Sequence, residues 1–416
     1  MPEGVAGTGA FLWSPPKSYT GQKTGEQDLT KWPDKVGVVI SCLLLYALFA
    51  SPFMTFRANR IVQGETRTVF EALPGSAATV LVTIVLLSAF IAFFRFPTRL
   101  KLVFALTGLA ALAVFVGQAA SFLMPEGNGF ARVSPASGFW LIFAGLALLA
   151  TDCIARLEPK PAARILLLLV AIAALAAVLI SGLWNDLSII KEYTGRADTF
   201  WTEALRHVEL AIGSLIAATV VGIPLGILCY KVERLRAGVL NSLNIVQTIP
   251  SIALFGLLIA PLGWIAATVP GAARVGIAGI GMAPAFVALF LYSLLPVVSN
   301  TVVGLSGVSQ AVREAARGLG MTPVQRLLRV EFPLAMPVIL TGIRIVLVQN
   351  IGLATIAALI GGGGFGVFVF QGIGQTAMDL VLLGTVPTVL LGFAAAITLD
   401  AIIDSNLFSA GGRQKA

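Results

Sequence analysis

The sequence predicts an all-α, polytopic membrane protein with about ten transmembrane helices. Of its 416 residues, 57% are hydrophobic and only 12% are charged, whereas soluble domains carry roughly 25% charged residues. The apolar residues also gather in long runs, and about 20 such residues let a helix cross a bilayer core of ~30 Å at ~1.5 Å per residue. Helices are expected because lipid cannot satisfy free backbone N–H and C=O groups.

Ten apolar segments follow one another along the chain, and polar or charged residues separate them. The expected spans are 36–56, 75–94, 100–118, 137–155, 164–183, 208–230, 238–260, 283–305, 334–358 and 379–403. Residues 184–207 form the longest polar stretch between spans and connect two sets of five helices, the first being 36–183. The polar segment 1–35 lacks a short apolar stretch with a cleavage site, so we interpret it as an N-terminal tail rather than a signal peptide.

Ten spans place both termini on one side of the membrane. If that side is the cytoplasm, most of the 28 Lys and Arg residues lie in cytoplasmic segments, including 306–333 and the C-terminal tail 406–416. Short loops rich in Lys and Arg usually stay inside; Arg57, Arg60 and Arg67 are exceptions. The net charge of +8 is therefore typical of cytoplasmic loops, and no nucleic-acid partner is expected. Membrane lipid is the expected surrounding.

A charged, turn-containing segment, 306–333, interrupts the apolar runs and reads as a short helix–turn–helix. Residues 308–319 contain helix-forming residues, and Gly318 and Gly320 then end the helix, since Gly tolerates the left-handed conformation just past a helix end. The alternative is a solvated loop with incidental charge. We prefer a docking surface for another protein, because such loops seldom combine a glycine stop, a capping pattern and apolar spacing.

The second helix of this segment begins with a recognisable cap. Thr322 can accept from the backbone three residues later, Pro323 suits the first helical position, and Gln325 can reach back. The expected apolar face consists of Val324, Leu327, Leu328 and Phe332. Pro333 is expected to mark the return to the membrane.

EAARGLGMTPVQRLLRVEFP, residues 314–333, resembles the cytoplasmic signature of ABC importer permeases. Five positions match its spacing, while Val330 and Phe332 are mild departures from it. The resemblance implies a type I ABC importer permease core in which this segment is the coupling helix that docks into an ATPase subunit. The docking residues that it implies are Glu314, Ala315, Ala316, Gly320 and Pro333.

Three further stretches look like permeases for glycine betaine, choline and related osmoprotectants: residues 247–258, 288–305 and 342–366. This resemblance covers about 200–405, with the core at 208–405 and the coupling helices at 306–333. The first five spans resemble the extended N-terminal region of one branch of these permeases, and we assign them no role. Alternatives that stay open are a permease for an amino acid such as methionine, and a membrane channel or scaffold without an ATPase.

The resemblance also implies partners and a location. These are a cytoplasmic ABC ATPase that binds the ATP, an extracytoplasmic substrate-binding protein, and a second permease copy or a homologous permease. The implied location is the bacterial inner membrane, where the protein is multi-pass with both termini in the cytoplasm. The chain itself is expected to be a transport subunit, not an enzyme, and to need no cofactor.

The sequence lacks the motifs that would make the chain a catalyst. GGGGFG, residues 361–366, has no following Lys and is not a phosphate loop; we expect a flexible outer connection. Cys42, Cys153 and Cys229 lie in apolar runs without metal-ligand spacing, and His207, the only histidine, is expected to be structural rather than a general base. No metal site is therefore expected, and a polytopic transferase is disfavoured.

Arg344 lies about ten residues into an expected span, or ~15 Å deep by helical rise. An Arg at such a depth costs roughly 2.5–3.5 kcal/mol on insertion scales, so it should face protein or water. Thr341 and Thr355 fall on the same helix face at 100° per residue. Arg344 either lines the transport route or forms an ion pair between helices, with Asp379 and Asp400 as candidate partners; we favour the ion pair.

Overall fold

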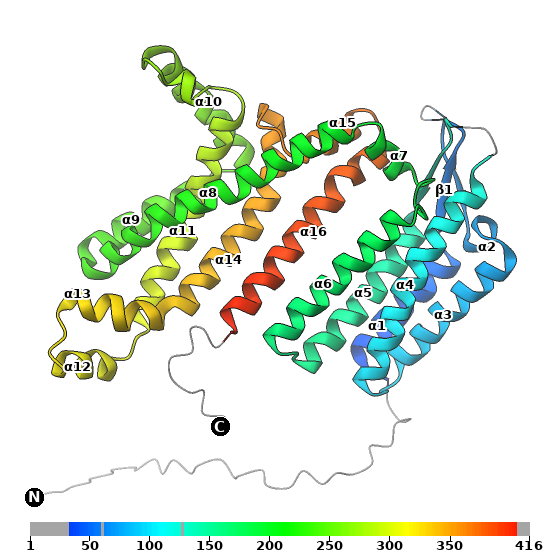
Figure 1. Cartoon of the computed structure of the whole chain (residues 1–416), viewed down its shortest axis with the longest axis horizontal. Coiled ribbons are helices and arrows are strands. Elements are labelled where there is room, and N and C mark those ends of the chain that lie inside the picture. The colour runs from blue at the N-terminus through cyan, green and yellow to red at the C-terminus, as the bar shows by residue number, and fades with distance from the viewer. Residues whose placement is uncertain (1–32, 60–61, 126–128, 406–416) are drawn as a thin grey trace, which may run out of the picture.

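The structure, a computed structural model, describes residues 33–59, 62–125 and 129–405. The tails predicted at 1–35 and 406–416 lie outside these residues, apart from residues 33–35. Within the described chain the fold is mainly helical with one small sheet (Figure 1), and nine helices are long and apolar enough to cross a membrane. The predicted helical, multi-pass membrane fold is confirmed.

The first helix is shorter than the predicted span 36–56. Helix α1 (Lys35–Phe49) has 15 residues, or ~22 Å at 1.5 Å per residue. The side chain of Asp34 caps it by accepting from the Val36 N–H at 3.3 Å. Residues Met54–Arg57 are a strand, β1, so the sequence between Phe49 and Arg57 leaves the helix although it is apolar.

Helix α1 packs with three longer helices into an N-terminal four-helix unit. These are α3 (Gly75–Phe93), α4 (Thr98–Leu123) and α5 (Ser137–Leu157). Helix α1 contacts α3 and α5, and α4 contacts the same two helices. Leu44, Leu81, Leu112, Ile142 and Leu146 are buried between them, so this unit has an apolar core of its own.

A three-stranded antiparallel sheet closes one end of the four-helix unit. Strand β1 lies in the centre, between β2 (Glu65–Arg67) and β3 (Arg132–Pro135), and the short helix α2 (Val69–Ala72) follows β2. Phe56 pairs with Val133 in the register of β1 and β3. The sheet is the one departure from the predicted all-helical fold within the described residues.

Helix α6 (Pro161–Ile180) packs mainly against α16 (Met378–Ile403), the last helix of the described chain. None of its residues is buried. The short helix α7 (Ser188–Thr194), in the polar stretch 184–207, contacts both β3 and α16. The sequence grouped α6 with the first five spans, but in space it lies beside the second half of the chain (Figure 1).

Four long helices form the second half. Helix α11 (Met282–Ser306) packs against α8 (Ala197–Lys231) and α14 (Phe332–Ile356), and α14 also contacts α16. A buried polar cluster joins three of them, because Asn350 Nδ2 donates to Ser214 Oγ and Ser293 Oγ, both at 2.9 Å. The short helix α15 (Gly366–Gly374) packs on α16.

The predicted span 238–260 is wrong as a continuous helix. The chain instead forms α9 (Glu233–Thr248) and α10 (Ser251–Thr268). Pro250 has no N–H and forces the residue before it out of the helical conformation, and Ile249 has φ −72° and ψ 127°. Of the two, α10 is long and apolar enough to cross a membrane, and a 3₁₀ turn, Ala273–Val275, follows it.

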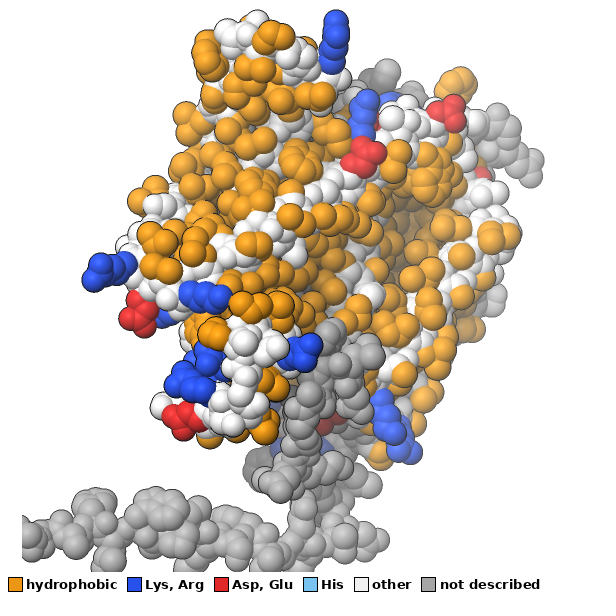
Figure 2. All heavy atoms as spheres, turned by 60° about the vertical axis from the view of Figure 1, so that its left-hand side comes forward, with side chains coloured by type: hydrophobic (Ala, Val, Ile, Leu, Met, Phe, Trp, Pro, Cys, Tyr) orange, Lys and Arg blue, Asp and Glu red, His pale blue; other side chains and the backbone are white. Residues whose placement is uncertain are grey.

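The described chain starts and ends at the same end of the molecule, where residues 310–326 also lie (Figure 1). Residues 310–326 belong to the predicted helix–turn–helix, which we call the hairpin, and we call this end of the molecule the hairpin end. The sheet and α15 lie at the opposite end. Figure 2 shows a broad hydrophobic surface on one face, with Lys, Arg, Asp and Glu side chains gathered mainly near the ends. Such a band suits a bilayer core.

Candidate functional site

The first helix of the predicted hairpin is α12 (Gln310–Gly318). Ser309 caps it by accepting from the Val312 N–H at 3.4 Å, and Arg313 Nη1 donates to the Tyr230 hydroxyl at 2.9 Å, which anchors α12 to the end of α8. Ala316 is buried, while Glu314 and Ala315 are exposed. The first two residues of the predicted docking set therefore face outward on an anchored helix.

The turn after α12 has the predicted chemistry. Gly320 adopts φ +77°, a conformation that costs other residues free energy because of their Cβ atom. Thr322 and Gln325 form the reciprocal cap, with the Thr322 N–H donating to Gln325 Oε1 at 3.0 Å and the Gln325 N–H donating to Thr322 Oγ1 at 3.3 Å. Helix α13 (Pro323–Arg326) starts there.

Pro333 lies in the first turn of the membrane helix α14, where the return to the membrane was expected. The helix is not interrupted there, because a π-helical segment at Leu327–Glu331 joins α13 directly to α14. Arg326 Nε lies 2.6 Å from Glu331 Oε1, and the Glu331 side chain is only 3% exposed. This pair was not predicted; its signal in the sequence was a Glu five residues after an Arg.

The expected apolar face of the second helix is only partly correct. Leu327 is buried, whereas Val324 and Leu328 are 59% and 60% exposed. Leu319, in the turn, is 79% exposed. The hairpin, residues 310–326, together with Leu328 thus presents apolar side chains beside Glu314 rather than burying them. A surface of this composition fits a protein partner better than water.

Arg344 pairs with Asp400, one of the two candidate partners. Arg344 Nη1 on α14 lies 2.5 Å from Asp400 Oδ1 on α16, and the side chains are 38% and 35% exposed. Thr341 hydrogen-bonds the backbone carbonyl of Pro337 at 2.9 Å and is not part of the pair. Thr355 lies three turns further along the same helix, or ~16 Å by helical rise, so the proposed polar face is not one contiguous site.

Asp379, the other candidate, binds elsewhere. Ser134 Oγ on β3 donates to Asp379 Oδ1 at 2.5 Å, and Asp379 is 6% exposed. Nearby, Arg132 Nε lies 3.6 Å from Glu192 Oε1, whose side chain is 5% exposed. These contacts join the sheet to the start of α16 and to α7. Ser134 and Asp379 are 245 residues apart in the sequence, so their contact could not be predicted from it.

The glycine-rich segment 361–366 is not the flexible connection that we expected. Residues 362–366 are buried, and Gly361, Gly363 and Gly364 adopt positive φ. The Gly364 N–H donates to Glu203 Oε2 at 2.6 Å, and the Phe365 N–H donates to His207 Nδ1 at 3.3 Å. Two side chains one turn apart on α8 therefore fix this turn. His207 has a structural contact, and the contact of Glu203 was not predicted from the sequence.

The described contacts connect the hairpin to the long helices of the second half. No cluster of three or more His, Cys, Asp or Glu side chains that could hold a metal occurs in the part of the chain that the structure describes. The described features are an exposed hairpin, a continuous connection from it to α14, and an ion pair that joins α14 to α16. Movement at the hairpin can thus reach helices within the membrane.

Comparison with known proteins identifies both parts of the chain. Residues 222–406 match the binding-protein-dependent transport system inner membrane component family, and residues 34–190 match the N-terminal domain of the ABC transporter permease YehY. The osmoprotectant import permease protein OsmW of Salmonella typhimurium is 43% identical over 196 residues, covering 47% of this chain and 83% of that protein. The choline transport system permease protein OpuBB of Bacillus subtilis is 35% identical over 205 residues, 49% of this chain and 87% of that one.

A solved structure, an inward-facing MetNI methionine ABC transporter, aligns with a TM-score of 0.45 and 23% identity over 50% of this chain and 96% of that one. The family match and the sequence relatives define the class: a multi-pass permease subunit of an ABC importer. The chain belongs to the binding-protein-dependent transport system inner membrane component family. The predicted resemblance to ABC importer permeases is thereby confirmed.

Proposed function

We propose that this permease carries quaternary ammonium osmoprotectants, the class of glycine betaine and choline, into the cell. The support is the set of relatives whose names specify osmoprotectant, choline, carnitine or glycine betaine transport, at 32–43% identity over about half of this chain. The family match, residues 222–406, contains α11 and α14 and the hairpin between them. The substrate class rests on these relatives rather than on any pocket in the chain.

The exposed hairpin is the proposed contact with a separate ATPase subunit in the cytoplasm. The observation that carries this proposal is that Glu314 and Ala315 face outward on a helix whose successor runs unbroken into α14. Closure of the ATPase on its ATP would displace the hairpin and tilt α14. Two transporter states can be interconverted in this way only if the ATPase contacts them differently.

The remaining proposals concern location and further partners. The hairpin end faces the cytoplasm, which places both termini there and the sheet outside the bacterial inner membrane. A separate extracytoplasmic substrate-binding protein delivers the solute, and a second permease copy or a homologous permease completes the route. The exposed parts of α9 and α10, in which only Leu254 and Phe255 are buried, leave surface for that second permease.

Reconstitution tests the proposal. The permease, its ATPase and its binding protein are placed in liposomes, and uptake of radiolabelled glycine betaine is measured with choline, carnitine or methionine as competitor. We expect ATP-dependent uptake that choline or carnitine reduces and methionine does not. Competition by methionine alone would instead identify an amino-acid permease, and failure to co-purify any ATPase would exclude an ABC importer.

Gly320→Pro and Glu314→Lys test the hairpin. Proline cannot adopt the φ of +77° found at Gly320, and Lys reverses the charge at an exposed docking position. We expect both variants to insert into the membrane at wild-type levels and to lose at least about 90% of uptake and of ATPase co-purification, as one lost contact of about 1.4 kcal/mol corresponds to a factor of ten. Arg329→Gln, on the exposed side of the junction, is the control and should transport normally.

A further inference from the structure

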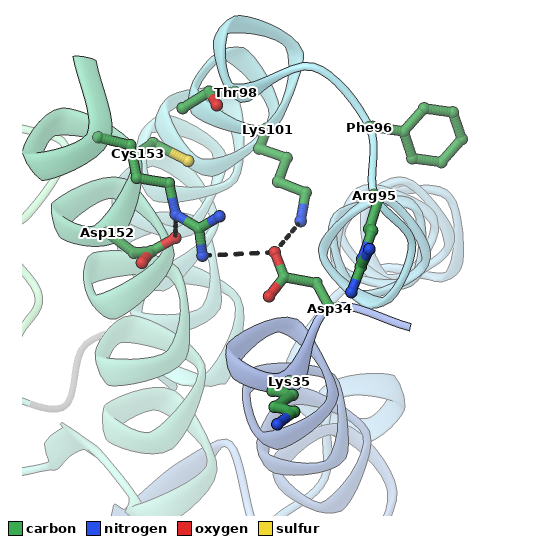
Figure 3. Close-up of a pocket in the computed structure, with 9 residues that line it drawn as sticks. Asp34, Lys35, Arg95, Phe96, Thr98, Lys101, Asp152 and Cys153 are labelled. Carbon is green, nitrogen blue, oxygen red and sulfur yellow. Dashed lines mark hydrogen bonds and ion pairs between the residues drawn. The ribbon is translucent and has the colours of Figure 1, made fainter. Parts of the chain in front are cut away.

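A cavity of about 400 Å³ opens at the hairpin end of the N-terminal four-helix unit. Its volume falls within the range of small-ligand sites, roughly 300–1,000 Å³. Figure 3 shows side chains from the start of α1, the turn between α3 and α4, and the end of α5 around it. The lining residues are Asp34, Lys35, Arg95, Phe96, Thr98, Lys101, Asp152, Cys153 and Arg156.

Ion pairs within the cavity already satisfy its two carboxylates. Lys101 Nζ lies 2.8 Å from Asp34 Oδ2, and the Lys101 side chain is 5% exposed. Arg156 Nη2 lies 3.4 Å from the same Asp34 oxygen, and Arg156 Nε lies 2.8 Å from Asp152 Oδ2. Figure 3 shows the Lys101 side chain pointing toward Asp34. These four residues form a neutral network.

Two further cations line the cavity without an acidic partner. Lys35 and Arg95 are exposed and form no ion pair within the described chain. The four cations and two carboxylates of the lining therefore leave an excess of two positive charges. Such an excess favours an anionic ligand, with the buried network as its support.

The first turn of α4 adds polar donors at the same place. The residue before this turn is Pro97, and no side chain caps the helix. The backbone bonds of this turn start at Leu100 and Lys101, so the N–H groups of Thr98 and Arg99 are left for solvent or a ligand. The start of a helix favours phosphate groups because it presents free N–H groups and the positive end of the helix dipole.

The cavity lies where the apolar parts of α3, α4 and α5 end, which is the level of the lipid headgroups if these helices cross the bilayer. Phe96 is one of the lining residues, and Figure 3 shows its ring pointing away from the ion pairs, where it can contact the glycerol or acyl part of a lipid. We propose that this cavity binds the phosphate group of an anionic phospholipid headgroup. The site lies in the region to which the transport proposal gives no role and does not depend on that proposal.

The experiment measures which lipid the full-length protein retains. The protein is placed in nanodiscs of phosphatidylcholine with or without phosphatidylglycerol, and the retained lipids are counted by native mass spectrometry. In the wild type, we expect phosphatidylglycerol to be retained in preference to phosphatidylcholine. The double substitution Lys35→Gln and Arg95→Gln should lower this preference at least about tenfold, because each cation near a charged membrane surface contributes roughly a factor of five.

Arg99→Gln is the matched control. Arg99 is an exposed cation in the same turn of α4 but does not line the cavity, so its loss removes only the general attraction of a surface charge and should lower the preference about fivefold at most, clearly less than the double substitution. Equal preference in the wild type and the double variant would overturn the proposal, and an equal loss in Arg99→Gln would show a diffuse charge effect and overturn it too.

A second arm separates lipid from free phosphate. Inorganic phosphate is titrated calorimetrically onto the protein in a neutral detergent without added lipid. Phosphate binding that the double variant loses, in a wild type with no lipid preference, would overturn the headgroup as ligand and identify a site for a soluble phosphate. Lipid preference with phosphate binding far weaker than lipid retention supports the proposal as stated.

Discussion

Arg344 and Asp400 carry opposite charges on two helices that cross the membrane. Arg344 Nη1 and Asp400 Oδ1 lie 2.5 Å apart, and the attraction between the two charges offsets part of the free energy that inserting each charge into the membrane costs. Asp400→Asn removes one charge and leaves Arg344 without its counter-ion, so we expect a loss of stability of about 1–2 kcal/mol. Thermal unfolding of the purified permease in detergent measures it.

Two variants make this measurement specific. Asp404→Asn removes the partner of Arg164, 2.7 Å away, where the carboxylate is 41% exposed at the end of α16, and it should have a much smaller effect. Arg344→Gln combined with Asp400→Asn removes both charges and should recover part of the loss. A double variant no more stable than Asp400→Asn would show that the two side chains do not stabilise each other.

Asp34 provides a pH-dependent contribution to stability. Partial burial raises the pKa of its carboxyl group, but the hydrogen bond from Lys101 and the charges of Lys101 and Arg156 outweigh this, and the pKa is lowered from 3.8. A carboxyl group with a lowered folded-state pKa stabilises the fold above its unfolded pKa, and this contribution is lost as the pH falls through the folded value.

We therefore expect Asp34→Asn to lower the thermal midpoint by a constant amount at neutral pH. The difference from the wild type should shrink as the pH falls below 3.8. Asp198→Asn is the control, because its exposed carboxylate has no ion pair within the described chain. A difference for Asp34→Asn that stays constant to the lowest accessible pH would contradict the assignment.

The sequence predicted single residues well where the chemistry is local. The left-handed Gly320 and the cap between Thr322 and Gln325 depend on neighbours within a few residues, and both occur as expected. Contacts between residues far apart in the sequence could not be predicted. Asp379 and Asp400 are both acidic and near a helix end, and only the packing of α16 determines that Asp400 is the one that contacts Arg344. Glu203 was overlooked for the same reason, since the turn that it fixes lies 161 residues away.

Elements were predictable from hydropathy except where the backbone overrides it. The apolar run across 238–260 includes Pro250, and the proline divides it into α9 and α10. Similarly, the apolar residues after Phe49 enter a strand that pairs at the end of the four-helix unit. Hydropathy reports burial or lipid contact, but it does not report whether the backbone hydrogen bonds are made within a helix or between strands.

The π-helical segment at Leu327–Glu331 is the element that connects the hairpin to the membrane. Its pair, Arg326 with Glu331, is largely buried, at 20% and 3% exposure. Glu331→Ala leaves Arg326 without its partner at this junction and should loosen it, since an unpaired charge in a poorly solvated place is costly. We expect the ATPase still to co-purify while uptake per ATP hydrolysed falls several-fold.

Arg329→Gln is the matched control for this junction. Arg329 lies in the same segment but is exposed and has no ion pair within the described residues, so uptake per ATP should remain at the wild-type level. Loss of ATPase co-purification in Glu331→Ala would mean that the pair shapes the docking surface itself rather than the connection to α14.

At the scale of the whole molecule, the N-terminal region holds α16 at both ends. At the opposite end from the hairpin, Ser134 donates to Asp379. At the hairpin end, Arg164 at the start of α6 lies 2.7 Å from Asp404, and α6 packs along α16 between these points. The sequence separated the two halves at 184–207 and could not show that they share this helix.

Because both ends of α16 are held, we expect the N-terminal region to move together with α16 rather than against it. Ser134→Cys with Asp379→Cys, in a chain whose exposed Cys42 is replaced by Ser, allows a short thiol cross-linker to join β3 to α16. Uptake by the cross-linked permease should remain within about twofold of the same variant before cross-linking. If the contact between β3 and α16 stays closed throughout the transport cycle, a cross-link there does not change the free-energy difference between the transporter states. Uptake that stops on cross-linking and returns when a cleavable linker is reduced would show instead that the sheet separates from α16 during transport, and the N-terminal region would then be a moving part.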